Sequence, residues 1–238
     1  MSICKTTQGF GANANTAYAS AGNKGHTGVD STCGYGSKVY ALKTAIVYKI
    51  LDKEHPARDG SGYWGVFMIA KDKNGKFIEW SIGHLSKIYV KVGDKVNPWD
   101  FIGEEGNRGK VFANGVEITP AMQNAGDTRG SHRHYNKKLL TKYADIGNRV
   151  YLTNWTPSNE QPQIFRDTEC NYYSVDNVEN GYSGSVDCAK DIADGRAEVE
   201  AHFAVTTTPL PPMQENPPTN KPTIRIRFVF NNNGWSTI

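Results

Sequence analysis

The chain has 238 residues, of which 38% are hydrophobic, so it is long enough to bury a core, and its formal net charge is +3. This mild charge excludes the dense basic face of a nucleic-acid-binding protein. No apolar run approaches the roughly 20 residues of a membrane span, and the first residues lack the layout of a signal peptide, so we expect no membrane span and no Sec export.

Apolar runs separated by turn signals dominate the first 137 residues or so. Residues 38–52, KVYALKTAIVYKILD, are rich in Val, Ile and Tyr, which favours a strand. Residues 63–85 place two β-type runs around Asn74-Gly75, a strong hairpin signal, and a further turn is expected at Gly93-Asp94. The pattern predicts a mainly β fold.

The character of the sequence changes in the second half. A short helix is expected at Lys137 to Tyr143, KKLLTKY, and no sustained helical periodicity follows. Residues 165–188 are polar and rich in tyrosine, and residues 206–223 form a proline-rich stretch typical of an extended spacer. The segment TIRIRFVF, residues 223–230, alternates as a half-buried strand does.

The four cysteines, Cys4, Cys33, Cys170 and Cys188, include no C-x-x-C, so neither a cysteine zinc site nor a thioredoxin-like motif is indicated. Two disulfides and four buried thiols both remain open, because the sequence does not state the redox compartment. Among the three possible connectivities, the most local one pairs Cys4 with Cys33 and Cys170 with Cys188.

Histidine and aspartate gather at two glycine-flanked places. The stretch GHTGVDS carries His26 and Asp30, and GSHRHYN carries His132 and His134. Two imidazoles and one carboxylate are a known ligand set of catalytic zinc that leaves a fourth position for water. His26, Asp30 and one histidine of the pair would supply this set, with the glycines around His26 expected to let the loop turn tightly. The alternative is that these side chains are ordinary solvated residues.

Four stretches between Thr6 and Asn136 carry a family resemblance: TTQGFGANANTAYASAGNKGHTGVD, YGSKVYALKTAIVYKI, WSIGHLSKIYVKVGDKVNPWDFIGEEGNRG and GSHRHY. In content and order they resemble the M23 family of zinc metallopeptidases, the lysostaphin-like cell-wall endopeptidases, and especially members associated with bacteriophages. The resemblance implies a mainly β, antiparallel β-sheet peptidase domain with an irregular C-terminal extension. We therefore divide the chain into a peptidase domain (1–160), a polar Cys-containing extension (161–204), a Pro-rich linker (205–222) and a C-terminal strand or tail (223–238).

Residue by residue, the resemblance implies that His26, Asp30 and His134 are ligands of Zn²⁺. It also implies that His84, in GHLS, and His132 are the family's two uncoordinated active-site histidines. A bound zinc lowers the pKa of its water towards ~7, and nearby histidines can position or deprotonate that water and steady the oxyanion. Which histidine does which is not decided by the sequence.

The chain departs from the family's pattern in three places. Ser31 replaces an apolar residue, and HRHYN replaces the usual HLHFE, with Arg133 expected to face away from the site. The connection between Gly109 and Gly130 is also longer than usual. A groove wall and a solvated insertion both remain open for it.

These observations predict a zinc-dependent endopeptidase that cleaves peptide bonds in peptidoglycan, without a covalent nucleophile. Because no export signal is visible, we expect a phage lysin, carried on the virion or released to the cell wall at infection or lysis. Phage virion (tail) proteins are the further partner expected for the C-terminal region.

Two rival functions come from other classes. A catalytically silent M23-like wall-binding or virion structural module would keep the fold, but it has no chemical need for three ligands and two further histidines. A sugar-cleaving lysin needs paired carboxylates, and the adjacent Glu104 and Glu105 show no constellation of that kind.

Overall fold

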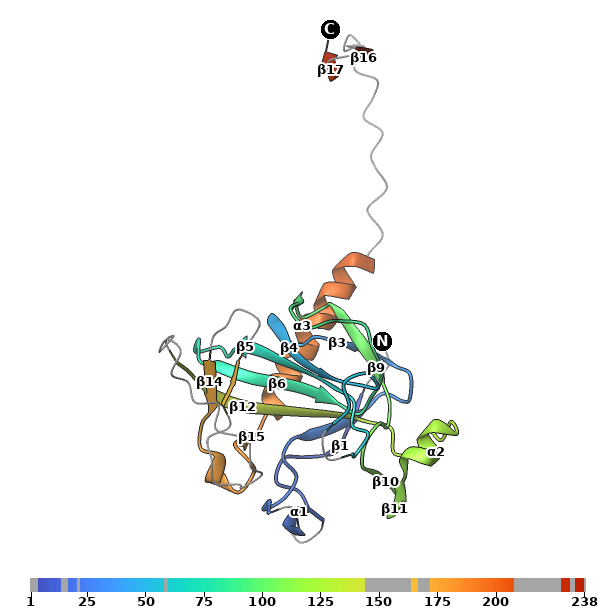
Figure 1. Ribbon diagram of the computed structural model, residues 1–238, viewed down its shortest axis with the longest axis vertical. Helices are drawn as coiled ribbons and strands as arrows, with labels where there is room; N and C mark the ends of the chain where they lie inside the picture. The colour runs from blue at the N-terminus through green and yellow to red at the C-terminus, as the bar shows by residue number, and fades with distance from the viewer. Residues whose placement is uncertain are drawn as a thin grey trace. The chain divides into compact units, whose positions relative to one another are not determined.

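Antiparallel strands are the main regular structure of the described residues (Figure 1), as predicted. The computed structural model describes residues 4–13, 17–20, 22–57, 60–143, 164–166, 172–207, 228–231 and 234–237. In spatial order, the main sheet contains β1 (Lys5–Gln8), β2 (Val29–Thr32), β12 (Arg133–Tyr143), β6 (Phe77–Gly83), β5 (Gly65–Lys71), β4 (Ala45–Leu51) and β8 (Lys95–Val96).

Shorter strands and helices complete the fold. A second sheet has the order β3 (Lys38–Tyr40), β9 (Phe101–Glu105) and β7 (Leu85–Ile88). The remaining strands are β10 (Val111–Ala113), β11 (Val116–Ile118), β13 (Ile164–Arg166), β14 (Tyr172–Val175), β15 (Ser185–Val186), β16 (Phe228–Asn231) and β17 (Gly234–Thr237). The helices are α1 (Ala17–Ser20), α2 (Pro120–Asn124), the single 3-10 turn at Val178–Asn180 and α3 (Ala189–Thr207).

Two of the expected turns are confirmed, and one expected strand is divided. Strands β5 and β6 pair around Gly75, which has a φ of 79°, and the Asp94 amide donates to the Lys91 carbonyl. Residues 38–52 do not form one strand, because β3 joins the small sheet and β4 joins the main sheet. The break between them lets this segment contribute to both layers.

The expected helix at Lys137 to Tyr143 is wrong, because these residues continue β12. Lys137 is the partner of Trp80 on β6 and of Val186 on β15. Hydrogen bonds to strands on both sides outweigh the modest helix propensity of KKLLTKY. Conversely, the 19-residue helix α3 was not predicted. Its buried apolar positions are few and widely spaced, so its sequence carries little helical periodicity.

Part of the expected extension belongs to the main sheet, because β14 and β15 both pair with β12. The expected boundary at residue 160 lies outside the described residues, and so does most of the expected linker. The chain separates into two compact units, 1–206 and 207–238. The second contains the β16–β17 hairpin, so the predicted C-terminal strand is present at its described residues.

One hydrophobic core joins the two sheets and α3. It includes Trp80 and Ile82 from β6, Ile102 from β9 and Ile192 from α3. Trp80, Ile82 and Ile102 have no solvent exposure. This core holds the edges of both sheets in place and thereby fixes the loops that follow their strands. No helix in the described part of the chain is long and apolar enough to cross a membrane.

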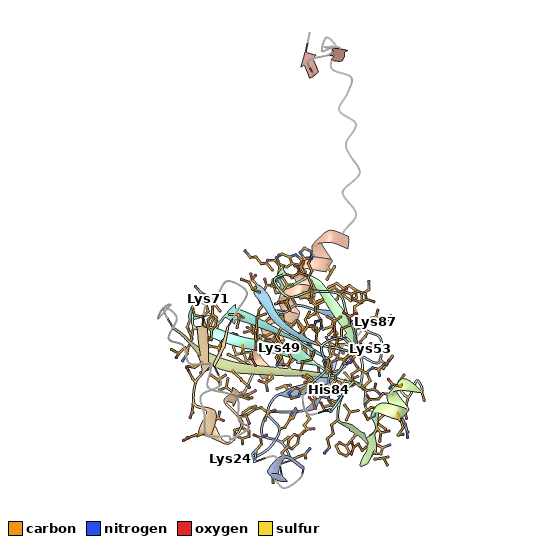
Figure 2. The ribbon with its side chains drawn as sticks, viewed as in Figure 1. Lys24, Lys49, Lys53, Lys71, His84 and Lys87 are labelled. Atoms are coloured by element: carbon orange, nitrogen blue, oxygen red, sulfur yellow. A yellow bond between two sulfur atoms is a disulfide. The ribbon has the colours of Figure 1, made fainter. Side chains whose placement is uncertain are left out.

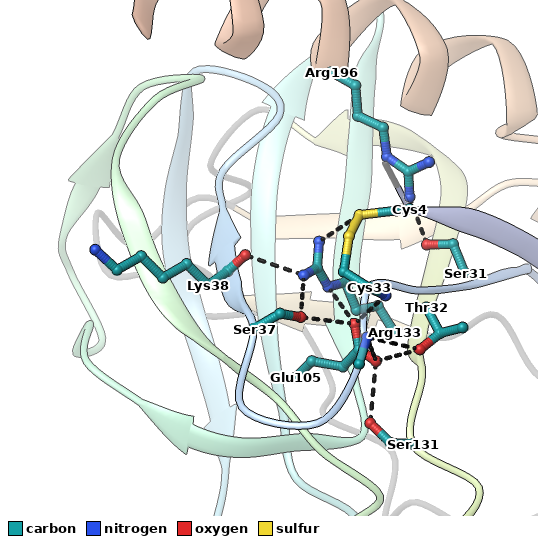
Figure 3. The surroundings of a disulfide bond; sticks show 11 residues. Cys4, Ser31, Thr32, Cys33, Ser37, Lys38, Glu105, Ser131, Arg133 and Arg196 are labelled. Atoms are coloured by element: carbon teal, nitrogen blue, oxygen red, sulfur yellow. Dashed lines mark hydrogen bonds and ion pairs between the residues drawn. A yellow bond between two sulfur atoms is a disulfide. The ribbon is translucent and has the colours of Figure 1, made fainter. Parts of the chain in front are cut away.

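A disulfide joins Cys4 to Cys33 at the end of the β1–β2 pair (Figure 3), which confirms the local pairing for these two residues. The other local pairing is wrong, since Cys188 is a free, buried thiol; Cys170 lies outside the described residues. The Cys188 thiol donates to the Tyr135 carbonyl, and burial raises its pKa to about 12.

Arg133 forms a buried ion pair with Glu105 beside this disulfide (Figure 3). Arg133 Nε lies 3.0 Å from Glu105 Oε2, off the line of its N–H, and one terminal nitrogen donates to Ser37. The Glu105 carboxylate has no solvent exposure and accepts further bonds from Thr32 and Ser131. Such a carboxylate is a structural anchor, so the rival sugar-cleaving site is not built around it.

Candidate metal centre

The register of three neighbouring strands places candidate ligands in one row. Asp30 on β2 is the direct partner of His134 on β12, and His134 is the partner of Gly83 on β6. His84 follows Gly83, and His26 lies in the loop that leads into β2. Residues far apart in the sequence therefore converge where these strands meet.

His26, Asp30 and His134 direct one ligand atom each to a common point. His26 Nε2 is 3.2 Å from Asp30 Oδ1 and 3.0 Å from His134 Nδ1, and these last two atoms are 2.9 Å apart. In a tetrahedral zinc site with bonds of about 2.0–2.1 Å, neighbouring ligand atoms lie about 3.3 Å apart. The triangle is close to this size.

The proton positions also suit a cation. His26 Nδ1 lies 3.1 Å from the Gly9 carbonyl, which can only accept, so Nδ1 carries the proton and Nε2 presents a lone pair. The contact of His26 Nε2 with Asp30 Oδ1 thus brings two acceptors together without a proton between them. A metal ion inside the triangle would bind both atoms, so the residues fit the zinc expected from the sequence.

Close packing explains the glycines around His26. A methyl group at Gly28 would collide with the Tyr135 carbonyl and the His134 ring, and one at Gly25 would meet the backbone of Gly11. Neither glycine is among those with a positive φ. The two glycines were expected to allow a tight turn. The structure instead shows that they leave space beside the ligands.

His132 and His84 lie beside the triangle. Their rings are 4.4 Å apart between centroids, and His132 Nε2 lies 3.6 Å from Asp30 Oδ2. His84 stands at the end of β6 (Figure 2) with a φ of 59°, which is uncommon for a residue with a side chain. Such strain is typical of a side chain held for function.

Burial sets the charge state of the cluster. Burial raises the pKa of Asp30, but the neighbouring His134, His26 and His132 outweigh it, so the pKa falls far below the usual range. Burial lowers the pKa of His84 strongly, helped by the neighbouring His132 and His134. The pKa of His134 is also lowered by burial, against the influence of Asp30. The cluster thus favours an ionised Asp30 carboxylate and neutral rings at His84 and His134.

Tyr63 is a site residue that sequence reasoning missed. Its ring packs edge-on against His84, with centroids 5.0 Å apart, and a methyl group at Gly83 would collide with its hydroxyl. Burial, with the charges of Asp30 and Glu79, raises the pKa of Tyr63, so the phenol stays protonated and can donate a hydrogen bond. No local motif marks it, because Tyr63 precedes β5 and reaches the site only through the sheet.

A separate groove lies away from this cluster. It has a volume of about 850 Å³ and is lined by residues of β4, β5 and α3, with Lys43 and Lys137 paired to Asp191. None of the five residues predicted for the site lines it. We therefore place the candidate site at His26, Asp30 and His134 and not in this groove.

Comparisons with known proteins agree with the family suggested by the sequence. Residues 24–136 match the family model described as Peptidase family M23. A search of curated proteins finds no match. Similar solved structures are LytU and the catalytic domain of lysostaphin from Staphylococcus simulans. LytU has 24% identity over 58% of this chain and 76% of that chain, with a TM-score of 0.39. The lysostaphin catalytic domain has 21% identity over 57% of this chain and 80% of that chain, with a TM-score of 0.36.

A third similar structure is the catalytic domain of a mutant of the prophage-encoded M23 protein EnpA from Enterococcus faecalis. It has 21% identity over 58% of this chain and 83% of that chain, with a TM-score of 0.40. The segment matched by the family model includes all of the histidine and aspartate residues of the site. Residues 24–136 are therefore similar to the peptidase domains of family M23.

Proposed function

We propose that the chain is a zinc-dependent endopeptidase that cleaves peptide bonds in bacterial peptidoglycan, with His26, Asp30 and His134 as the zinc ligands. The observation that carries this proposal is the buried triangle of ligand atoms at 2.9–3.2 Å. The family match of residues 24–136 supports the reaction class. Zinc, when bound, would polarise the scissile carbonyl and acidify a water molecule.

The side chains around the triangle can handle the proton and the developing negative charge. The Nδ1–H groups of His84 and His132 donate to backbone carbonyls, which leaves both Nε2 atoms free to accept. One ring can take a proton from the attacking water and pass it to the leaving amine, while the other steadies the transition state. The protonated phenol of Tyr63 can donate a hydrogen bond to the oxyanion.

We further propose that the enzyme is a phage lysin, carried on the virion or released to the wall, with unit 207–238 as a docking element for virion tail proteins or the wall. The division of the chain into two compact units supports the idea. Truncation before about Pro209 should leave cleavage of soluble muropeptides largely intact while changing attachment to walls or virions. Loss of folding on truncation would assign the C-terminal strands to the main core.

Digestion of purified peptidoglycan tests the reaction class. The full chain should release new amino groups, with no rise in reducing sugar, and a metal chelator should stop the release. Reducing ends that appear and persist with the chelator would indicate a sugar-cleaving lysin. Binding to peptidoglycan without release of either group would support the silent wall-binding module instead.

A further inference from the structure

The long connection between β9 and β12 touches both histidines that lie outside the ligand triangle. The Nδ1–H of His84 donates to the Arg108 carbonyl at 2.7 Å, near the start of this connection. The Nδ1–H of His132 donates to the Gly130 carbonyl, also at 2.7 Å, near its end. Because a carbonyl can only accept, each contact assigns the proton to Nδ1 and turns Nε2 towards the site.

A buried glutamine ties the first end of this connection to its middle. Gln123 lies on α2 and is only 5% exposed. Its side-chain amide donates to the Gly109 carbonyl at 2.7 Å and to the Ile118 carbonyl at 2.8 Å, so both N–H donors are used. Gly109 follows Arg108 directly, so these bonds restrain the backbone next to the carbonyl that accepts from His84.

A buried asparagine ties the second end. Asn107 is 1% exposed, and its amide donates to the carbonyls of Asp127 at 2.7 Å and Arg129 at 3.0 Å. Arg129 precedes Gly130, which carries the acceptor of His132. The backbone next to Asn107 also contacts this histidine, because the His132 amide donates to the Gly106 carbonyl. The two buried amides therefore hold opposite ends of the same segment.

We propose that Gln123 and Asn107 are positioning residues that fix the tautomer and orientation of His84 and His132 through the carbonyls of Arg108 and Gly130. The positioning of the two rings does not depend on the proposed function. Only the reaction that the rings catalyse rests on it. A solvated insertion would expose its polar side chains, whereas these two amides are buried with all their donors paired. The connection is thus part of the active-site scaffold.

The test compares Gln123→Met and Asn107→Leu in the full chain, because both changes keep approximate volume and remove the amide. Glu117→Gln is the matched control, since Glu117 is exposed on β11 in the same connection. Imidazole ¹⁵N shifts report the tautomers of His84 and His132, while kcat, KM and zinc content are measured on the same proteins. Hydrolysis of a soluble muropeptide supplies the kinetic values.

In the wild type and the control, we expect Nδ1–H on both rings. Gln123→Met should mix the tautomers of His84, and Asn107→Leu those of His132. Each should lower kcat about tenfold to 100-fold, with KM and zinc content little changed. A purely structural role would lower the thermal midpoint without moving the ¹⁵N signals. If Asn107→Leu does not fold, Gln123→Met decides alone.

Wild-type tautomers and kcat in Gln123→Met would overturn the proposal. Failure of the proposed function looks different, because the wild type would then hydrolyse no muropeptide while Gln123→Met still altered the His84 signals. An active wild type with unchanged signals in the variants would remove the positioning role and leave the endopeptidase proposal standing.

Discussion

Asp30 and His134 are direct cross-strand partners on β2 and β12, with Asp30 Oδ1 2.9 Å from His134 Nδ1. A shift of the register by one residue would turn one of these side chains to the opposite face of the sheet. The candidate metal site is therefore a product of sheet pairing, which the surrounding core and the β1–β2 disulfide both stabilise.

The histidines outside the triangle should separate metal binding from turnover. We expect His84→Ala and His132→Ala to keep their zinc and to lose about 10²-fold or more in kcat, because a positioned acid-base or oxyanion group is lost. Elemental analysis and muropeptide hydrolysis measure the two properties. Near-wild-type turnover in both variants would return these histidines to a structural role.

Removal of the cation that pairs with Glu105 should destabilise the fold. Arg133→Met leaves a carboxylate without solvent exposure and without its ionic partner, so we expect a loss of about 3–5 kcal/mol in the free energy of unfolding. Chemical denaturation measures it. The matched control is Lys190→Met, which breaks an exposed pair with Asp194 and should cost less than about 1 kcal/mol. Equal, small effects in both variants would contradict the anchoring role of Glu105.

The disulfide between Cys4 and Cys33 should stabilise the N-terminal strand. The two residues are separated by 29 positions, and closing a loop of this length contributes about 3–4 kcal/mol in the chain-entropy account. Replacement of both cysteines by alanine should lower the free energy of unfolding by about this amount. Since β1 leads to the Gly9 carbonyl that holds His26, zinc affinity should fall as well. Unchanged stability and affinity would show that β1 is held by its sheet pairing alone.

The sequence predicted the parts of the fold that depend on local chemistry. The hairpin turn at Asn74-Gly75 follows from its residue types, and the β character of the first half follows from its apolar runs. Residues 137–143 were misread because the bonds that make them a strand come from β6, β14 and β15. Long-range pairing of this kind leaves little trace in a short window of sequence.

The candidate site also has residues that the sequence predicts and residues that it does not. His26, Asp30 and His134 could be selected because their residue types and order resemble a family motif, and the structure brings them together. Tyr63 and Gln123 carry no such mark. Tyr63 reaches His84 through the room left by Gly83, and Gln123 acts through two backbone carbonyls. Contacts made by packing and by backbone atoms cannot be read from residue types.

Metal analysis of the purified chain tests the central claim most directly. The wild type should contain about one zinc per chain, while Asp30→Ala and His134→Ala should lose most of it, because each removes one of three ligands. His55→Ala is the matched control, since His55 is an exposed histidine paired with Asp52 outside the cluster, and it should keep its zinc. A wild type without bound metal, or full zinc content in both ligand variants, would contradict the account.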